Sequence, residues 1–304
     1  MYTEYIQLKT NTEDKMLNIV YNPTAAKGKA RKKLKIVEKK LTEMSINYKI
    51  SESLREKHAI ELTKQLIEDG ATDIVAMGGD GTINEVLNGF SNFENVNFGI
   101  IPSGSGNDFV NSIGIPLNVE KALDIIINGK TKFTDYMQMD GVRGINVIGT
   151  GIDVDILKRC KKAKIFKGKF QYLVSLIVSL FKFRNYNLDI TYNEKTEKRT
   201  GLLACVCNGR LFGGGIKICP IANTDDGYMD YMVAFNVRKR KIPHAFISLM
   251  KGTILEEPIA HTEKTKEIEI TSPEKITVNV DGELYENLPF KVKLIHEKLR
   301  IYRP

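Results

Sequence analysis

The sequence predicts an α/β N-terminal domain, with a parallel sheet and helices on both faces, followed by a β-rich C-terminal domain built as an antiparallel sandwich. Between residues 16 and 128, short apolar runs alternate with helical patterns, as in parallel sheets. Beyond residue 133, strand patterns follow one another with few helical stretches, which is typical of antiparallel domains. A Gly-rich strand–helix corner at 78–81 marks the edge at which parallel sheets bind ligands.

The N-terminal domain is expected over 16–132, after a polar, flexible tail at 1–15. Each expected strand is a short apolar run, and each expected helix carries apolar residues at helical spacing. A turn at 22–24 follows the first strand, and Gly70 ends the second helix. The expected strands are 17–21, 46–50, 73–77 and 97–101. The expected helices are 27–44, 58–68, one that starts at Thr82, and 119–127.

The C-terminal domain is expected over 133–294, with the option that 295–304 completes the N-terminal domain. Its strand patterns are 134–139, 146–148, 188–192, 202–207, 228–235, 267–271, 275–280 and 291–294. Only two helical stretches, 169–183 and 243–251, are expected to interrupt them.

Composition and charge fit a globular protein with anionic partners. The chain has 304 residues and a net charge of +8, which suits nucleotide phosphates or acidic lipid headgroups. No recognised nucleic-acid-binding motif accompanies the basic residues, so no nucleic acid partner is expected. Cys205 and Cys207 alternate along an apolar run, so we expect them on one face of a buried strand. This cysteine usage, and the lack of an export signal pattern, predict a cytoplasmic protein.

A basic run and an apolar stretch adjoin one another at 158–183. Seven basic side chains and no acid lie within 158–169, and the apolar stretch 170–181 follows. At ~1.5 Å per residue this stretch is roughly 18 Å long as a helix, too short for the ~30 Å hydrocarbon core of a membrane. The helix either packs in the protein core, the favoured interpretation, or rests on an anionic membrane surface.

The corner Gly78-Gly79-Asp80-Gly81 carries the strongest chemical signal. It joins a buried strand to a helix N-terminus, where phosphate oxygens can approach bare backbone N–H groups at the positive end of the helix dipole. The corner is neither a Walker loop nor G-x-G-x-x-G, and an ordinary strand–helix turn is the alternative interpretation.

Three further motifs accompany this corner. Loop 103–109 offers hydroxyl groups and an acid that opens a helix, and loop 208–215 is rich in glycine. Asp281 and Glu283 place two carboxylates two residues apart at the end of a strand. Asp-Gly is also a strong hairpin signal, so a purely structural role for Asp281 stays open.

Together these motifs resemble the diacylglycerol kinase catalytic-domain family, which includes soluble bacterial diacylglycerol and lipid kinases and the sphingosine and ceramide kinases. The matching segments are 78–86, 104–109, 208–215 and 281–283, in the family's order, and the resemblance covers 16–304. It implies an N-terminal nucleotide-binding domain of the NAD-kinase/diacylglycerol-kinase-like type and a C-terminal lipid-substrate domain.

The resemblance implies which residues contact ATP. The turn at 22–26 matches the first nucleotide-contacting turn of the family, and 78–84 matches its phosphate loop. Ser53 and Ser105 stand where the family has a hydroxyl near the nucleotide. The implied contacts are Asn22, Pro23, Thr24, Ala25, Ala26, Ser53, Gly78, Gly79, Asp80, Gly81, Thr82, Ile83, Asn84, Glu85 and Ser105.

The same resemblance implies roles for the acids. Glu283 is the predicted general base, and Asp281 is predicted to help through the metal or the hydroxyl. Asp80 is predicted to help hold Mg²⁺–ATP.

A second, structural Mg²⁺ site is implied by 223–230. Its ligands would be the Asp226 carboxylate and the backbone carbonyls of Asn223 and Tyr228, an oxygen-only set that suits Mg²⁺. A plain acidic turn is the alternative.

The resemblance therefore implies an ATP-dependent lipid kinase, peripheral at the inner face of the membrane, that converts diacylglycerol to phosphatidic acid. Family members commonly pair, so a homodimer is also implied. The alternatives are a kinase of a sphingoid base or another lipid alcohol, an NAD kinase, and a catalytically idle lipid- or nucleotide-binding regulator. The motifs at 104–109 and 281–283 favour the lipid branch over NAD kinase, and the intact acids argue against the idle regulator.

Overall fold

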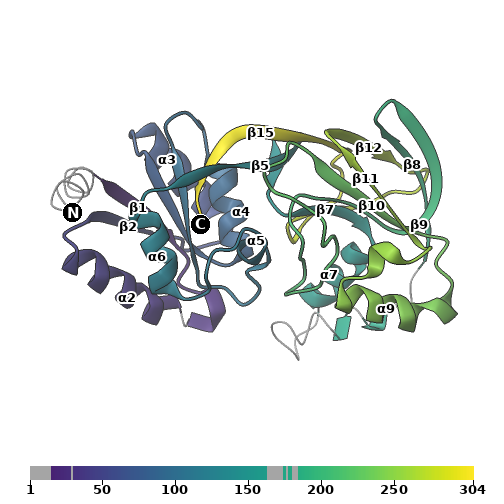
Figure 1. Ribbon diagram of the computed structural model, residues 1–304, viewed down its shortest axis with the longest axis horizontal. Helices are drawn as coiled ribbons and strands as arrows, with labels where there is room; N and C mark the ends of the chain where they lie inside the picture. The colour runs from purple at the N-terminus through teal and green to yellow at the C-terminus, as the bar shows by residue number, and fades with distance from the viewer. Residues whose placement is uncertain (1–14, 29, 163–173, 176, 180–183) are drawn as a thin grey trace. The chain divides into compact units, whose positions relative to one another are not determined.

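The computed structural model describes residues 15–28, 30–162, 174–175, 177–179 and 184–304 (Figure 1). The chain divides into two compact units, each described by itself below. The N-terminal unit comprises Met1–Thr134 with Lys298–Pro304, and the C-terminal unit comprises Asp135–Glu297. The predicted tail up to residue 14 and most of the predicted helix 169–183 lie outside the described residues.

The N-terminal unit is built on a parallel sheet. Its strand order is β15–β4–β3–β1–β2, and all four neighbouring pairs are parallel. The four predicted strands are present; β2 begins one residue later than predicted, and the observed strands otherwise extend one or two residues beyond the predicted ends. The strands are β1 (Met16–Tyr21), β2 (Asn47–Glu52), β3 (Asp73–Gly78), β4 (Asn97–Pro102) and the last residues of β15 (Phe290–Tyr302).

Helices cover both faces of this sheet, as predicted. Apolar side chains of α2 and α6 share one core with alternate residues of β1 and β3, including Ile19 and Val75. On the other face α3 packs against α4, so closely that a Cβ on Gly89 would lie 2.6 Å from the Ile60 carbonyl oxygen. The helices are η1 (Ala25–Gly28), α2 (Ala30–Glu43), α3 (His58–Glu68), α4 (Asp80–Gly89), α5 (Asp108–Ser112) and α6 (Val119–Ile127).

The C-terminal end of the chain completes the N-terminal core. Arg300 pairs with Asn97 in the parallel ladder, and the Tyr302 side chain is buried. Its hydroxyl donates a hydrogen bond to Asp73, and Lys15 Nζ donates to the Ile126 carbonyl at 2.8 Å. The predicted strand at 291–294 was therefore too short, because the same strand continues to Tyr302. Lys15, predicted as part of the flexible tail, is held in place.

The C-terminal unit is an antiparallel β-sandwich with helices on an outer face. In β9, Ala204 and Val206 face the core between the sheets, while Cys205 and Cys207 face a second cluster under the helices. The two cysteine Sγ atoms lie 3.8 Å apart, which confirms that they share a face. The strands are β5 (Thr131–Met139), β6 (Val142–Gly144), β7 (Val147–Gly151), β8 (Tyr186–Tyr192), β9 (Lys195–Cys207), β10 (Met229–Phe235), β11 (Ala260–Thr265), β12 (Glu267–Thr271), β13 (Val278–Val280), β14 (Glu283–Tyr285) and the first part of β15.

The prediction of only two helical stretches after residue 133 was wrong. A further helix, α7 (Ile152–Lys162), follows β7 directly. Its sequence is mostly charged, and only a short apolar face, which includes Ile152 and Ile156, packs against the C-terminal unit. The predicted helix at 243–251 is α9 (Ile242–Lys251). Two 3₁₀ turns flank α9, η2 (Lys239–Lys241) and η3 (Ile254–Glu256).

No helix among the described residues is long and apolar enough to cross a membrane. Within the predicted helix 169–183, the described residues 174–175 and 177–179 are helical. Ser175 and Ser179 are buried there, whereas Ile177 and Val178 are exposed.

The hydrogen bond from Tyr302 to Asp73 gives a test of how the chain end contributes to stability. Tyr302→Phe leaves a buried carboxylate without one of its donors, so we expect a loss of about 1–3 kcal/mol in the free energy of unfolding. Urea denaturation measures it, with Tyr48→Phe as the control because Tyr48 is partly exposed. Equal stability of the two variants would show that the chain end is held by packing alone.

Candidate functional site

Two Gly-rich loops of the N-terminal unit touch at the level of their backbones. The backbone N–H groups of Ser103 and Gly104 donate to the Gly78 carbonyl at 2.8 and 3.1 Å. A Cβ on Gly104 would lie 2.3 Å from the Gly79 Cα, so this approach requires glycine. The carboxyl ends of β3 and β4 therefore form one continuous corner, in which Gly79 and Gly104 are partly exposed.

Asp80 binds one of these loops to the other. Its carboxylate accepts hydrogen bonds from the backbone N–H groups of Asn107, at 2.7 Å, and Phe109, at 3.3 Å. Burial raises the pKa of Asp80, and these backbone hydrogen bonds oppose that rise. Asp80 also opens α4, two residues before the predicted start, because an acid is favourable in a first helical turn. A direct contact of Asp80 with Mg²⁺–ATP stays a prediction.

The turn after β1 lies beside the same corner. Asn22 Nδ2 donates to the Thr82 hydroxyl at 3.3 Å, and Asn22 Oδ1 accepts from the backbone N–H and hydroxyl of Thr24. Ala25 N–H donates to the Asn22 carbonyl at 3.3 Å. The structure thus brings the turn that includes Pro23 and leads to Ala26 next to the Gly78–Thr82 segment.

The remaining predicted nucleotide contacts divide into exposed and buried groups. The Ser105 side chain is exposed, whereas Ser53 is buried, and its hydroxyl donates to the Arg55 carbonyl at 3.3 Å. Along α4, Ile83 is buried in the core, as is Asn84, and Gly81 is exposed. Glu85 accepts from the Ala59 N–H at the start of α3.

In the C-terminal unit, the Asp281 carboxylate accepts three backbone N–H groups. The donors are Ile145, Asn146 and Val147, at 2.6, 3.0 and 2.8 Å. Asp281 and Gly282 form the left-handed turn between β13 and β14, so the hairpin interpretation is correct for their backbone. Asp281 therefore holds the segment 145–147 in place, and its predicted help through the metal or the hydroxyl stays a prediction.

Glu283 follows that turn as the first residue of β14, with its side chain partly exposed. Asn208, from the Gly-rich motif at 208–215, is buried, and its amide donates to the Asp135 and Ile145 carbonyls at 2.7 Å each. Asp281 and Asn208 therefore both hold Ile145, the first through its N–H and the second through its carbonyl, and Asp281 belongs to the turn just before Glu283.

The candidate structural metal site lies at the start of β10. Asp226 Oδ1 accepts from the Tyr228 N–H at 3.1 Å, and its other oxygen pairs with the Lys264 ammonium. The nearby carboxylate of Asp135 accepts from the Gly227 N–H and pairs with His296 at 2.6 Å. The oxygen-rich set fits Mg²⁺ in its chemistry, but the cation would have to replace the ammonium at Asp226. The ligand set with Asn223 and Tyr228 stays a prediction.

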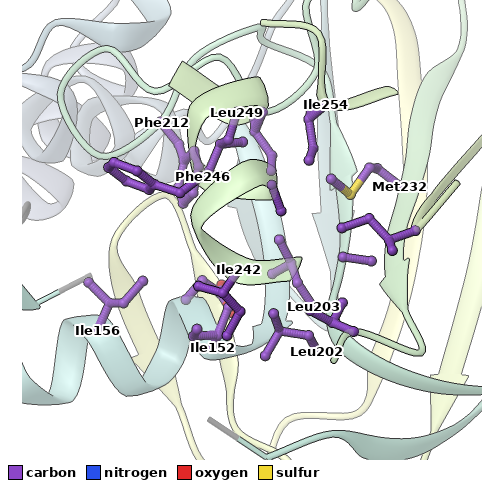
Figure 2. A pocket seen from close by; sticks show the side chains of 16 residues that line it. Ile152, Ile156, Leu202, Leu203, Phe212, Met232, Ile242, Phe246, Leu249 and Ile254 are labelled. Carbon is purple, nitrogen blue, oxygen red and sulfur yellow. The ribbon is translucent and has the colours of Figure 1, made fainter. Parts of the chain in front are cut away.

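An apolar pocket opens between the outer face of the C-terminal sheet and helices α7 and α9 (Figure 2). The cavity volume that the centres of water-sized spheres can occupy is about 70 Å³, and the whole space between its walls, open solvent included, is about 630 Å³. Phe246 and Leu249 of α9 and Leu203 of β9 are among the side chains that point into it. Sequence reasoning missed this pocket, because its lining comes from several elements distant in the chain.

Asp153 is the one acid among the residues that line this pocket. It is 3% exposed, its Oδ2 accepts from Asn279 Nδ2 at 3.0 Å, and its Oδ1 has no hydrogen-bond partner among the described residues. Burial raises the pKa of Asp153 to about 6. An acid directly after the strand-to-helix step Gly151-Ile152 was the signal that could have found it.

Because Gly79 and Gly104 approach so closely, we expect the effect of a glycine-to-alanine substitution on stability to depend strongly on which glycine is replaced. Gly104→Ala forces the two loops apart, so we expect about 1–3 kcal/mol of destabilisation and weaker nucleotide binding. Gly81→Ala is the matched control for stability alone, because a Cβ there meets nothing within 4 Å and alanine favours the helix. Thermal unfolding measures both variants, and nucleotide titration compares Gly104→Ala with the wild type. If Gly104→Ala behaves like Gly81→Ala, the loop contact is not a constraint.

The raised pKa of Asp153 predicts a pH-dependent stability. Because the folded pKa of about 6 exceeds the ordinary value of 3.8, the ionised form is penalised in the folded state, and stability falls as pH rises between these values. Asp153→Asn should therefore be more stable than the wild type at pH 7.5, by up to about 3 kcal/mol, and the gain should vanish near pH 4. Urea unfolding at the two pH values decides. A gain that does not change with pH would contradict the burial of an ionised carboxylate.

Comparison with known proteins agrees with this architecture. Residues 16–139 match the model of the diacylglycerol kinase catalytic domain, and 146–303 match the YegS C-terminal NAD kinase beta sandwich-like domain. A protein named diacylglycerol kinase from Staphylococcus carnosus is 27% identical over 292 residues, 95% of each chain. One of the same name from Bacillus subtilis is 28% identical over 294 residues, 95% of this chain and 97% of its own.

A solved structure shows the same fold. The crystal structure of a diacylglycerol kinase from Bacillus anthracis str. Sterne aligns with a TM-score of 0.74 and 23% identity, over 96% of this chain and 97% of that chain. With one domain model matching the α/β unit and the other spanning just over half of the chain, the chain belongs to the diacylglycerol kinase catalytic-domain family and is a lipid kinase.

Proposed function

We propose that this lipid kinase transfers the γ-phosphoryl group of ATP to the free hydroxyl of diacylglycerol and forms phosphatidic acid. The observation that carries the choice of a lipid acceptor is the apolar pocket of the C-terminal unit. Its lining is aliphatic and aromatic apart from Asp153, which suits an acyl chain and not a dinucleotide. The curated relatives, named diacylglycerol kinase over nearly their whole length, support the particular acceptor.

The corner at 78–81 is our proposed phosphate site. The backbone of Gly79 and the N-terminus of α4 offer N–H groups and a favourable dipole to phosphate oxygens, whereas the Gly104 N–H is already bonded to the Gly78 carbonyl. Asn22 and Thr82 close one side of this corner. Mg²⁺ bound with ATP would supply charge neutralisation at the γ-phosphate, with Asp80 as the acid of this chain proposed to help hold it.

We further propose that Glu283 accepts the proton of the lipid hydroxyl. Asp281 is committed to three backbone N–H groups, and so it orients the turn that presents Glu283. This division of roles supports Glu283 over Asp281 as the base. We also propose that Asp226 with the carbonyls of Asn223 and Tyr228 binds a structural Mg²⁺, and that the enzyme works in the cytoplasm at the inner face of the membrane.

A sphingoid base is a second candidate acceptor, and one observation favours it. Asp153 is among the residues that line the apolar pocket, and one of its carboxylate oxygens is buried without a hydrogen-bond partner among the described residues. Almost no polar surface faces the pocket, so an ammonium group on the lipid would pair with that oxygen only if the side chain turned toward the pocket. Diacylglycerol offers only hydroxyl and ester groups. Diacylglycerol remains our proposal because the relatives carry that name.

The assignment is tested by phosphate transfer from labelled ATP with Mg²⁺ to dioctanoylglycerol, sphingosine or NAD in parallel. We expect labelled phosphatidic acid, and a fall in kcat of about 10²–10⁴-fold in Glu283→Gln with unchanged thermal unfolding. Asp281→Asn should instead lower stability by about 1–3 kcal/mol, because it removes a charged acceptor from three N–H groups.

Each unexpected product has a definite meaning. Labelled sphingosine phosphate would move the acceptor to the sphingoid bases, and labelled NADP would overturn the lipid assignment. If Glu283→Gln reacts at the wild-type rate, the base is a different residue.

A further inference from the structure

Helix α9 is apolar on both of its long faces. Its inner face carries Phe246 and Leu249 into the pocket (Figure 2). On its outer face Ile247 is 50% exposed and Met250 is 43% exposed. His244 and Ser248 give the helix a polar side, but its outer face leaves Ile247 and Met250 exposed among the described residues, so an apolar partner there would stabilise it.

The exposed apolar surface continues beyond the helix. Lys217 Nζ donates to the Lys251 carbonyl at 3.3 Å, and the Pro220 ring lies within 3.4 Å of where a Cβ on Gly252 would be. The neighbouring Ile221 is 54% exposed. Single exposed apolar residues are ordinary, but Ile247 and Met250 lie one turn apart on the helix, and Ile221 follows Pro220, which lies beside the end of the helix. Exposed apolar groups close together in this way are typical of an interaction surface.

A basic cluster adjoins this patch. The four consecutive residues Arg238, Lys239, Arg240 and Lys241 are all exposed and lead directly into α9. The acids of the same region are Glu256 and Glu257, and Glu257 is already bound to His244 at 2.8 Å and to Ser248 at 2.6 Å. The surface is therefore basic beside an apolar helix face, the combination that anionic bilayers attract.

We propose that the outer face of α9, with Ile221 and the basic run 238–241, docks on the surface of an anionic lipid bilayer. The proposal rests on the proposed function, since it takes the acceptor to be a bilayer lipid. The helix that touches the bilayer on one side then forms a wall of the acyl-chain pocket on the other, so a lipid reaches the pocket without crossing water. A lipid that had to pass through water on its way to the pocket would expose its acyl chains and lose the hydrophobic stabilisation that the bilayer provides.

Vesicle flotation tests the docking surface without nucleotide. The wild type is mixed with phosphatidylcholine vesicles, or with vesicles that also contain phosphatidylglycerol. We expect binding to the anionic vesicles, and a loss of affinity of about tenfold or more in Ile247→Ser/Met250→Ser and in Lys239→Ala/Arg240→Ala.

The chain offers matched controls for both variants. Leu117 and Met44, 49% and 46% exposed in the N-terminal unit, match the apolar pair in chemistry and exposure, and Lys32 and Lys35 of α2 match the basic pair. Met44→Ser/Leu117→Ser and Lys32→Ala/Lys35→Ala should float like the wild type. Thermal unfolding of every variant shows whether the fold is kept.

Three results would overturn the proposal. The wild type could ignore anionic vesicles, the α9 variants could bind as tightly as their controls, or size-exclusion chromatography could show that the α9 variants convert a dimer to a monomer, which would assign the face to a second copy. The rate on dispersed dioctanoylglycerol separates this test from the proposed function. It stays at the wild-type value in the α9 variants if only docking is lost, whereas no turnover by the wild type refutes the proposed acceptor instead.

Discussion

Carboxylates that accept backbone N–H groups hold the loops of both units in place. Asp80 fixes the loop after β4, Asp281 fixes the segment before β7, and Asp135 fixes the turn before β10 through Gly227. Hydrogen bonds to a charged acceptor contribute roughly 1.5–3 kcal/mol each, which is enough to order a short loop. Asp80 and Asp281, for which the sequence predicts catalytic or binding roles, therefore also fix the position of the backbone around them. Asp281 belongs to the turn directly before Glu283.

The C-terminal sheet contributes to two apolar clusters, because successive side chains of a strand point to opposite faces of the sheet. One face of β9 fills the core of the sandwich with residues such as Val206, and the other face lies under α7 and α9. An apolar face covered by helices rather than by another sheet leaves room for the pocket. The same helix α9 then carries apolar groups on its outer face as well, and this joins the proposed acyl-chain site to the proposed bilayer surface.

Local signals were strong enough to predict the α/β half nearly to the residue. Helices 58–68 and 119–127 have the predicted bounds, because apolar spacing and end signals agree there. The β-rich half was harder. Helix α7 was missed because its charges conceal a short apolar face, and β11 was missed because a strand with the sequence AHTEKT lacks an apolar run. These elements owe their form to the neighbours they pack against.

The sequence by itself determined the fold class, the Gly-rich corner and the family resemblance, since each depends on residues close together in the chain. Only the tertiary structure decided that Gly79 and Gly104 touch, that Asp281 is bound by three backbone N–H groups, and that Asp153 is buried in an apolar pocket. Each of these joins segments that lie far apart in the sequence. Local sequence patterns show the spacing of apolar residues and the residues that favour turns. Packing between distant segments decides which groups bond to a carboxylate and which side chains line a pocket.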